Sequence, residues 1–231
     1  MAEGMTQHDV EFAEKRFSGT SKTNHKDFDK NGYLVVKNLC DPKELYRPVP
    51  ELRGQLNYWG KSEDSYNHIP IENQVEGSVA CYWHPQYRSI HSQVRLKLEK
   101  IIGKKLYNTY YYDRFYFPGQ GLKIHCDRPS CEISVSVHVS SNVKNPWKLW
   151  IKTPDVGDVK GENHSAILDV GDGMIYKGCE RPHWRDPLPI EYTRKWYGKR
   201  VEKKNLYYHQ VFFHYVLADG IRSHHANDAA R

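Results

Sequence analysis

Short stretches of strand-forming residues make up most of the chain after Gly103. They are rich in Tyr, Phe, Trp, Val and Ile, and clusters of Gly, Pro, Asn and Asp separate them. Six stretches are predicted as strands: 107–117, 132–139, 147–152, 165–170, 173–176 and 206–217. A series of short strands joined by turns is typical of a β-sandwich or a jelly roll.

The helical signals lie before this region. Asp41 can cap a helix whose first position is Pro42, which suits that place because its missing N–H is not needed there. A longer helix is predicted over 85–102, where apolar residues recur at helical spacing and Gly103 ends it. A short strand is predicted over 32–37. The sequence therefore predicts an α+β fold, a jelly roll with N-terminal helices packed on one sheet.

The chain is expected to form one domain. Its 231 residues are 39% hydrophobic and 27% charged, which excludes wholesale disorder. Residues 1–26 are polar and lack a sustained period, so we expect a flexible arm there. The single domain is expected over 27–218, since no linker or repeat interrupts it, and residues 219–231 are expected to form a polar tail.

The sequence favours a cytoplasmic protein without membrane association. No run of apolar residues is long enough to cross a bilayer, and the N-terminus lacks the apolar core of a secretion signal. The five cysteines are scattered and form no Cys-x-x-Cys pair. A disulfide framework or a thiolate zinc site is therefore not expected.

Basic residues concentrate in the stretch 194–204, in a chain whose net charge is +6. Such a stretch could contact nucleic acid, or it could be a solvated loop. We favour the solvated loop and expect no nucleic-acid partner, because an anionic small-molecule ligand would need only one or two of these charges.

Two His-x-Asp triplets occur, His25 with Asp27 and His125 with Asp127. The triplet carries little information by itself, so its surroundings must decide. His25 lies in the polar arm, where a rigid metal site is not expected. His125 and Asp127 lie at the end of a predicted strand, and residues two apart on an extended chain share one face.

A third ligand is needed, and His183 is the candidate, just after the predicted strand 173–176. Two imidazoles and one carboxylate on one face of an octahedron form the site of non-haem Fe(II) oxygenases, which leaves positions open for a cosubstrate and O2. The alternative is that these three residues are ordinary polar side chains at the rim of a sandwich.

The sequence around these residues resembles the 2-oxoglutarate/Fe(II)-dependent oxygenase superfamily. The resemblance rests on residues 117–127 (FPGQGLKIHCD) and 180–185 (ERPHWR), and it is greatest to the prolyl-hydroxylase-like branch with its uncharacterised phage and bacterial relatives. Residues 127–134 (DRPSCEIS) resemble a signature of that uncharacterised subgroup, and 31–39 (NGYLVVKNL) resembles the first strand of such enzymes. The resemblance covers roughly residues 27–218.

This resemblance implies a double-stranded β-helix and a hydroxylase. His125, Asp127 and His183 would be both metal ligands and catalytic residues, holding Fe(II). The cosubstrate 2-oxoglutarate would chelate the iron and be oxidatively decarboxylated to succinate by O2. This decarboxylation would be coupled to hydroxylation of a C–H bond in a small-molecule or peptidyl substrate, such as a prolyl or another amino-acid residue.

The far carboxylate of 2-oxoglutarate requires a cation, and a bidentate arginine suits it. Arg185 lies two residues beyond His183 and shares its strand face, so we prefer it. Arg194 is the competing candidate because relatives place the basic residue about ten positions after the distal histidine, but it lies in the basic stretch. A salt bridge to Glu180 or Asp186 is the structural alternative for Arg185.

Alternating residues of the strand before the metal motif are candidates for ligand contacts. Tyr110 and Tyr112 are expected to contact 2-oxoglutarate, and Arg114 and Tyr116 to contact substrate. Arg128, next to the carboxylate ligand, is the third substrate candidate; it would receive an anionic group or orient Glu132. Ordinary core packing is the alternative for the tyrosines, since the opposite strand face is aromatic too and either face could point inward.

Two other functions fit the same sequence. A non-catalytic jelly-roll binding module would keep the fold and form no succinate. A nucleobase oxygenase would use the basic stretch 194–204 to contact nucleic acid, with strongly salt-dependent binding.

Overall fold

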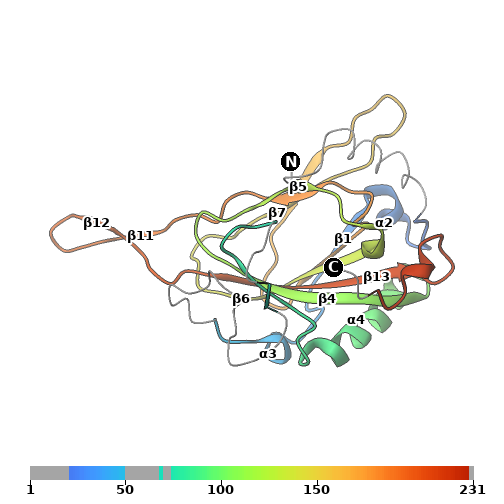
Figure 1. The fold of residues 1–231 in the computed structure, drawn as a ribbon. Coiled ribbons are helices and arrows are strands. Elements are labelled where there is room, and N and C mark those ends of the chain that lie inside the picture. The colour runs from blue at the N-terminus through green and yellow to red at the C-terminus, as the bar shows by residue number, and fades with distance from the viewer. Residues whose placement is uncertain (1–20, 50–67, 70–73, 229–231) are drawn as a thin grey trace.

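Two antiparallel β-sheets face each other in the computed structural model, which describes residues 21–49, 68–69 and 74–228 (Figure 1). Among these residues, the larger sheet has seven strands. In spatial order they are β1 (Tyr33–Val36), β9 (Gly173–Tyr176), β6 (Ile133–Ser141), β13 (Tyr208–Leu217), β4 (Leu106–Tyr116), β3 (Val79–Tyr82) and β2 (His68–Ile69). The smaller sheet has the order β5 (Leu122–His125), β10 (His183–Arg185), β7 (Leu149–Lys152) and β8 (Asn163–Ala166). A separate ribbon pairs β11 (Tyr192–Arg194) with β12 (Arg200–Glu202).

The chain passes repeatedly from one sheet to the other. It runs through β4 in the larger sheet, β5 in the smaller, β6 in the larger, β7 and β8 in the smaller, β9 in the larger, β10 in the smaller and β13 in the larger. This path is a double-stranded β-helix. The predicted α+β jelly roll is therefore confirmed.

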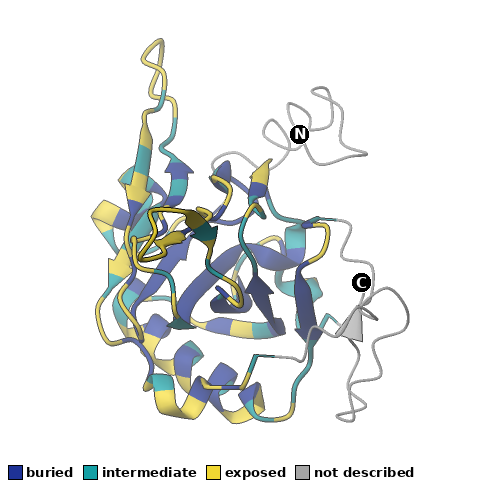
Figure 2. Cartoon of the chain, turned by 90° about the vertical axis from the view of Figure 1, so that its left-hand side faces the viewer, coloured by how far each residue is buried: buried dark blue, intermediate teal, exposed yellow. Residues whose placement is uncertain are grey.

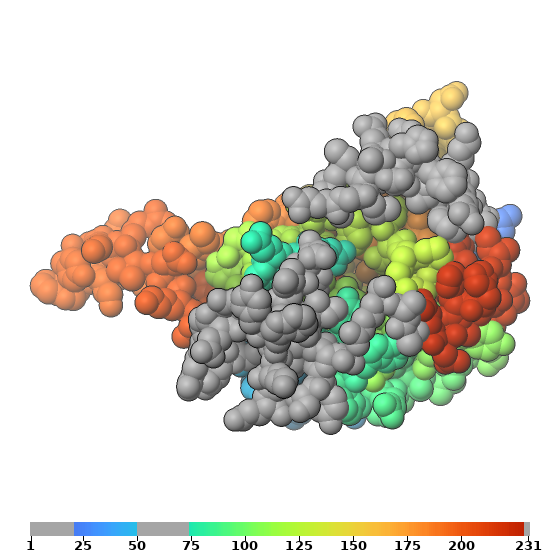
Figure 3. Space-filling model, in the orientation of Figure 1, coloured from blue at the N-terminus to red at the C-terminus, as the bar shows by residue number. Residues whose placement is uncertain are grey.

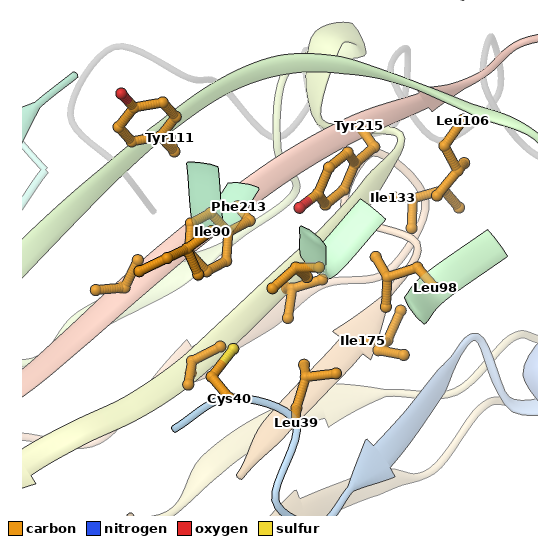
Figure 4. Packing of buried hydrophobic residues seen from close by; sticks show 14 of the residues in the cluster. Leu39, Cys40, Ile90, Leu98, Leu106, Tyr111, Ile133, Ile175, Phe213 and Tyr215 are labelled. Atoms are coloured by element: carbon orange, nitrogen blue, oxygen red, sulfur yellow. The ribbon is translucent and has the colours of Figure 1, made fainter. Parts of the chain in front are cut away.

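Helices cover the outer face of the larger sheet (Figure 1). The described helices are α2 (Lys26–Asn31), α3 (Pro42–Leu45) and α4 (Tyr87–Ile102), with the 3-10 turns η1 (Pro129–Cys131) and η2 (Ser223–His225). The Asp41 side chain accepts a hydrogen bond from the backbone of Lys43 and caps α3, as predicted. Gly103 ends α4 in the left-handed conformation, at φ +67°. Ile90 and Leu98 of α4 lie in one apolar cluster with Phe213 and Tyr215 of β13 (Figure 4).

Side-chain alternation on β4 separates this outer core from the space between the sheets. Tyr111 packs in the cluster with α4, whereas Tyr110, Tyr112 and Tyr116 belong to an inner cluster that also contains Leu122 of the smaller sheet. From Tyr110 to Tyr116, the even-numbered residues of β4 therefore point inward, which answers the question that the sequence left open. Figure 2 shows the buried residues gathered on the strands.

One charge is buried on the helix side of β4. Asp113 is fully buried and accepts hydrogen bonds from Arg47 Nη1 at 2.9 and 2.7 Å, Tyr87 Oη at 3.1 Å and His209 Nε2 at 2.8 Å. Arg47 is also buried. The network joins the segment after α3, the start of α4 and the two central strands β4 and β13.

Ser21 and Arg222, near the two ends of the described chain, are anchored in the fold. Ser21 and Arg222 are each 1% exposed. Ser21 Oγ and Arg222 Nη1 bond to the buried carboxylate of Glu132 at 2.9 and 3.0 Å, and Ser21 N donates to Glu180. A buried carboxylate such as that of Glu132 is costly unless it is paired and hydrogen-bonded, and Ser21 and Arg222 supply these partners inside the fold. The predicted domain limits of 27–218 stay a prediction, and residues 1–20 lie outside the described residues.

Several strands differ from their predicted limits. The predicted strand 165–170 corresponds to β8 (Asn163–Ala166), because the chain turns before Gly171, whose φ is +90°. β3, β11 and β12 were not predicted, since their sequences lack clear alternation between apolar and polar residues. Within the described part of the chain, no helix has the length and apolar character needed to cross a membrane.

Candidate metal centre

Adjacent strands of the smaller sheet bring the three predicted ligands together. β5 and β10 are antiparallel, and His125 pairs directly with His183; Asp127 follows two residues beyond His125. Asp127 Oδ1 lies 3.5 Å from Nε2 of each histidine. Ligands held at about 2.1 Å from one ion at right angles would be about 3 Å apart, so the spacing fits a shared ion.

Backbone carbonyls fix which nitrogen each histidine offers. His125 Nδ1 lies 2.9 Å from the carbonyl oxygen of Lys123, and His183 Nδ1 lies 2.9 Å from that of Arg181. Carbonyls only accept, so both Nδ1 atoms carry the proton and donate it. Each Nε2 lone pair is therefore directed at Asp127, which is the arrangement that metal-binding histidines use.

Asp127 is held from the side opposite the histidines. Its Oδ2 accepts a hydrogen bond from Ser134 Oγ at 2.8 Å, and its backbone N–H donates to Gly178 O at 2.8 Å. A Cβ at Gly178 would overlap with Asp127 Oδ2 and Ser134 Oγ, so the glycine makes room for this contact. His214 Nδ1 lies 3.0 Å from Ser134 Oγ. Because the Ser134 hydroxyl donates to the carboxylate, His214 Nδ1–H donates to the hydroxyl.

The site keeps its carboxylate ionised. Burial alone would raise the pKa of Asp127, but the adjacent His183 and His125 hold it well below its usual value. Burial alone would lower the pKa of His183, and Asp127 raises it above its usual value instead. Burial and then the neighbouring His183 lower the pKa of His125. Two imidazoles and one carboxylate are a donor set for Fe(II), and their atoms lie close enough to hold one ion.

Gln74, which the sequence analysis did not single out, lies against this site. Its Nε2 is 2.9 Å from His125 Nε2, so its amide donates to the lone pair that an ion would take. Its Oε1 accepts a hydrogen bond from Arg114 Nη2 at 2.9 Å. Metal binding at His125 therefore requires the Gln74 side chain to move.

A second group of possible ligands shares Asp127 and adds Cys131 and His214. Burial and then the Asp127 charge raise the pKa of the Cys131 thiol, so it stays protonated, and Tyr110 Oη lies 3.1 Å from its sulfur. A protonated thiol is a poor ligand, so the triad is the better metal site. His25 lies elsewhere, where its Nδ1 accepts from the backbone of Phe28 and caps α2.

Arg185 lies inside the fold and Arg194 outside it. Arg185 is 2% exposed, with its guanidinium carbon 4.4 Å from the ring centre of Trp147 and 4.8 Å from that of Tyr208. Its Nη1 donates to the backbone oxygen of Trp147 at 2.8 Å. Its Nε and Nη2 have no hydrogen-bond partner among the described residues, and the alternative salt bridges to Glu180 and Asp186 do not form there. Arg194 is exposed on β11.

The predicted tyrosines and Arg114 occupy the inner face of β4 but differ in their neighbours. Tyr112 stacks on Phe212 at 4.5 Å and on Tyr82 at 4.6 Å between ring centres. Arg114 Nη1 donates to Tyr116 Oη at 3.1 Å.

The aromatic residues that pack on Arg185 are Trp147 and Tyr208. Tyr116 and Tyr208 each lie 5.0 Å from the ring of Trp147, which packs on Arg185. Trp147 and Tyr208 were missed because their relation to Arg185 depends on strand pairing. The alternating aromatic and polar residues of the last strand were the available signal for Tyr208.

Arg128 has a partner that the sequence analysis did not anticipate. Its Nη1 pairs with Asp228 at 2.8 Å, and its guanidinium carbon lies 4.4 Å from the ring centre of Tyr110. Arg128 does not orient Glu132, because Arg222 takes that carboxylate. The difference follows from the anchored C-terminal segment, which supplies both Asp228 and Arg222.

Comparisons with known proteins give a likeness in structure only. No family model matches the sequence, and no curated protein is found as a relative. A prolyl-4-hydroxylase from Pseudomonas putida is similar, at TM-score 0.50 and 14% identity, covering 82% of this chain and 95% of that chain. HygX from Streptomyces hygroscopicus, solved with nickel and 2-oxoglutarate bound, gives TM-score 0.51 and 9% identity, covering 82% and 85%.

A third similar structure is a prolyl hydroxylase from Trichoplax adhaerens in complex with a peptide fragment of the hypoxia inducible factor oxygen degradation domain. It gives TM-score 0.51 and 12% identity, with 100% of both chains covered. Several of the similar structures are described as 2-oxoglutarate/Fe(II) oxygenases or prolyl hydroxylases. The fold of this chain is therefore that of the 2-oxoglutarate/Fe(II)-dependent oxygenases.

Proposed function

We propose that this protein is a 2-oxoglutarate/Fe(II)-dependent dioxygenase that hydroxylates a C–H bond of a small-molecule or peptidyl substrate. The observation that carries the proposal is the meeting of His125, Asp127 and His183, with both Nε2 atoms 3.5 Å from Asp127 Oδ1. The fold supports it, and so do Nε and Nη2 of buried Arg185, which have no hydrogen-bond partner in the part of the chain that the structure describes.

His125, Asp127 and His183 would hold Fe(II), which when bound supplies the oxidative chemistry with O2 and 2-oxoglutarate. Ser134 keeps the Asp127 carboxylate turned toward the two histidines. Backbone carbonyls accept the Nδ1 protons of both histidines, so each ring would offer Nε2 to the metal.

Arg185 would bind the far carboxylate of 2-oxoglutarate. Nε and Nη2 lie on one edge of the guanidinium, which matches the two oxygens of a carboxylate. The rings of Trp147 and Tyr208 both pack against the guanidinium. Tyr110 and Tyr112 stay candidates for further contacts with 2-oxoglutarate on the inner face of β4.

The substrate would bind beside Arg114, Tyr116 and Arg128. Gln74 forms hydrogen bonds with both Arg114 and His125. An incoming ligand that displaces Gln74 would therefore reach both the Arg114 guanidinium and the metal. The Trichoplax prolyl hydroxylase is in complex with a peptide, which makes a peptidyl substrate one candidate. All five cysteines are free and buried, which suits a reducing compartment such as the cytoplasm.

Succinate formation tests the proposal directly. Purified protein is loaded with Fe(II) without air, given 2-oxoglutarate and a panel of peptides and amino acids, and then exposed to O2. We expect succinate from the wild type and none from His125→Ala or Asp127→Ala. His25→Ala is the matched control from the other His-x-Asp triplet and should keep full turnover.

A separate variant addresses the cosubstrate. Arg185→Gln should raise the KM for 2-oxoglutarate more than it lowers kcat, because it removes binding that ground state and transition state share. If the wild type binds neither the metal nor 2-oxoglutarate, the chain is a jelly-roll binding module instead. If His25→Ala abolishes turnover and His125→Ala does not, the other triplet is the site.

A further inference from the structure

The ribbon of β11 and β12 extends away from the two sheets. We call residues 191–204 the basic arm; Figure 3 shows it at the left, outside the body of the molecule. Its strands pair antiparallel. Two backbone hydrogen bonds close its turn, from Lys195 N to Lys199 O at 2.8 Å and from Gly198 N to Lys195 O at 2.9 Å. Gly198 has φ +86°, in the left-handed region that favours glycine. The basic stretch predicted as a solvated loop is therefore a formed hairpin.

The base of the arm is tied to the domain. Glu191 accepts hydrogen bonds from the backbone of Lys144 and from Lys203 Nζ, the latter at 2.7 Å. Just beyond the arm, Asn142 Nδ2 donates to Asn205 O at 2.8 Å and Asn142 Oδ1 accepts from the backbone of Tyr207 at 2.8 Å. Contacts on both strands of the base hold the arm in one direction relative to the sheets.

The arm carries most of the excess positive charge. It contains six basic and two acidic residues, in a chain with net charge +6. Lys203 pairs with Glu191, and the other five cations make no ion pair with described residues: Arg194, Lys195, Lys199, Arg200 and Lys204. Arg194 lies directly opposite Arg200 across the ribbon. Like charges in that position repel, so an anionic ligand would relieve the repulsion.

Aromatic rings at the turn are exposed to solvent. Trp196 is 95% exposed and Tyr197 is 58% exposed, and the two rings meet edge to face at 5.4 Å. Neither ring packs on the described part of the domain, so neither contributes to the core seen there. Near the base, the guanidinium carbon of Arg200 lies 4.5 Å from the ring centre of Tyr192, which is 47% exposed. Figure 2 shows the arm, pointing toward the viewer, as mostly exposed.

We propose that the basic arm binds single-stranded nucleic acid. Its cations would contact phosphates, and Trp196 and Tyr197 would stack on unpaired bases. The exposed rings favour a single strand over a duplex, whose bases are already stacked on one another. They also favour it over an acidic polypeptide, because a polypeptide supplies carboxylates but few flat faces for stacking.

Binding is measured by fluorescence anisotropy with a labelled oligo-dT of about 12 nucleotides, a length within the range of known single-strand sites. If three to five phosphates are neutralised, the slope of log affinity against log salt is about −2 to −3.5 for a single strand. A rise from about 50 to about 200 mM salt then weakens binding about 20- to 100-fold.

Two variants separate stacking from charge. The double variant Trp196→Ala and Tyr197→Ala should weaken binding at least about 10-fold with an unchanged salt slope. The double variant Lys195→Gln and Lys199→Gln should reduce the slope by about 1.4. Lys43→Gln with Lys100→Gln removes two exposed charges from helices and is the matched control, expected to change neither quantity.

Circular dichroism and Fe(II) binding verify that each variant is folded, since none of these residues belongs to the metal centre. The proposal is overturned if the aromatic variant binds oligo-dT as tightly as the wild type. It is also overturned if poly-glutamate or a duplex of equal charge binds as tightly as the single strand.

Discussion

Replacing Ser134 with Ala tests whether the fold aims the Asp127 carboxylate at a metal. The Ser134 hydroxyl is 2.8 Å from Oδ2, which leaves Oδ1 directed at His125 and His183. Without it the carboxylate can rotate away. Partners that orient metal ligands in this way are worth about 10- to 100-fold in metal affinity, or about 1.4–2.7 kcal/mol.

The same change should lower the free energy of unfolding. His214 is 2% exposed, and burial lowers its pKa to about 3, so the ring is neutral. Its Nδ1–H, 3.0 Å from Ser134 Oγ, loses its acceptor in the variant. A buried donor left without a partner costs about 1–3 kcal/mol.

Calorimetric titration of the metal-free protein with Fe(II) under nitrogen, together with urea denaturation, measures both effects. Ser140→Ala is the matched control on the same strand, because its hydroxyl makes no hydrogen bond with described residues. We expect Ser134→Ala to weaken Fe(II) binding about 10- to 100-fold and Ser140→Ala to change it less than about twofold. Equal affinities for the wild type and Ser134→Ala would refute the reasoning.

Two further predictions concern stability. Asp113→Asn leaves the buried Arg47 without its counter-charge and should lower the free energy of unfolding by about 3–5 kcal/mol, measured in urea; a loss below about 1 kcal/mol would contradict it. Burial lowers the pKa values of His91, His138 and His214 to about 4, 4 and 3. The unfolded chain therefore binds protons that the folded chain does not, and stability present above about pH 6.5 is lost as the pH falls toward 4. Between about pH 7.5 and 5.5 the loss is about 1.4 kcal/mol for each histidine, and equal stability in urea at the two pH values would be the contrary result.

The sequence predicted the parts of the fold that depend on local pattern. The helix over 85–102 has a continuous apolar stripe and a glycine at its end, and it forms α4 (Tyr87–Ile102). The long strands β4 and β13 have enough aromatic and β-branched residues to be recognised. β5 and β10 are harder, because they are short and carry side chains that form a polar site rather than an apolar core.

The candidate ligands could be predicted because two of them are two residues apart on an extended chain. The contacts of Gln74, Ser134 and His214 with the site could not be predicted. Ser134 and His214 reach it through pairing of distant strands, and Gln74 reaches it from the segment before β3. Arg222 was missed for a similar reason. A single arginine in a polar stretch does not indicate that it will pair with a buried glutamate, here Glu132.

The place of β13 in the larger sheet has a consequence for biosynthesis. It is the last strand of the described chain, yet it lies between β4 and β6 and pairs with both. On the ribosome, the edges of these two earlier strands that face β13 therefore stay unpaired until β13 has emerged. The sheet closes only after β13 has been synthesised, and until then the nascent protein depends on chaperones or on rapid synthesis to avoid pairing with other chains.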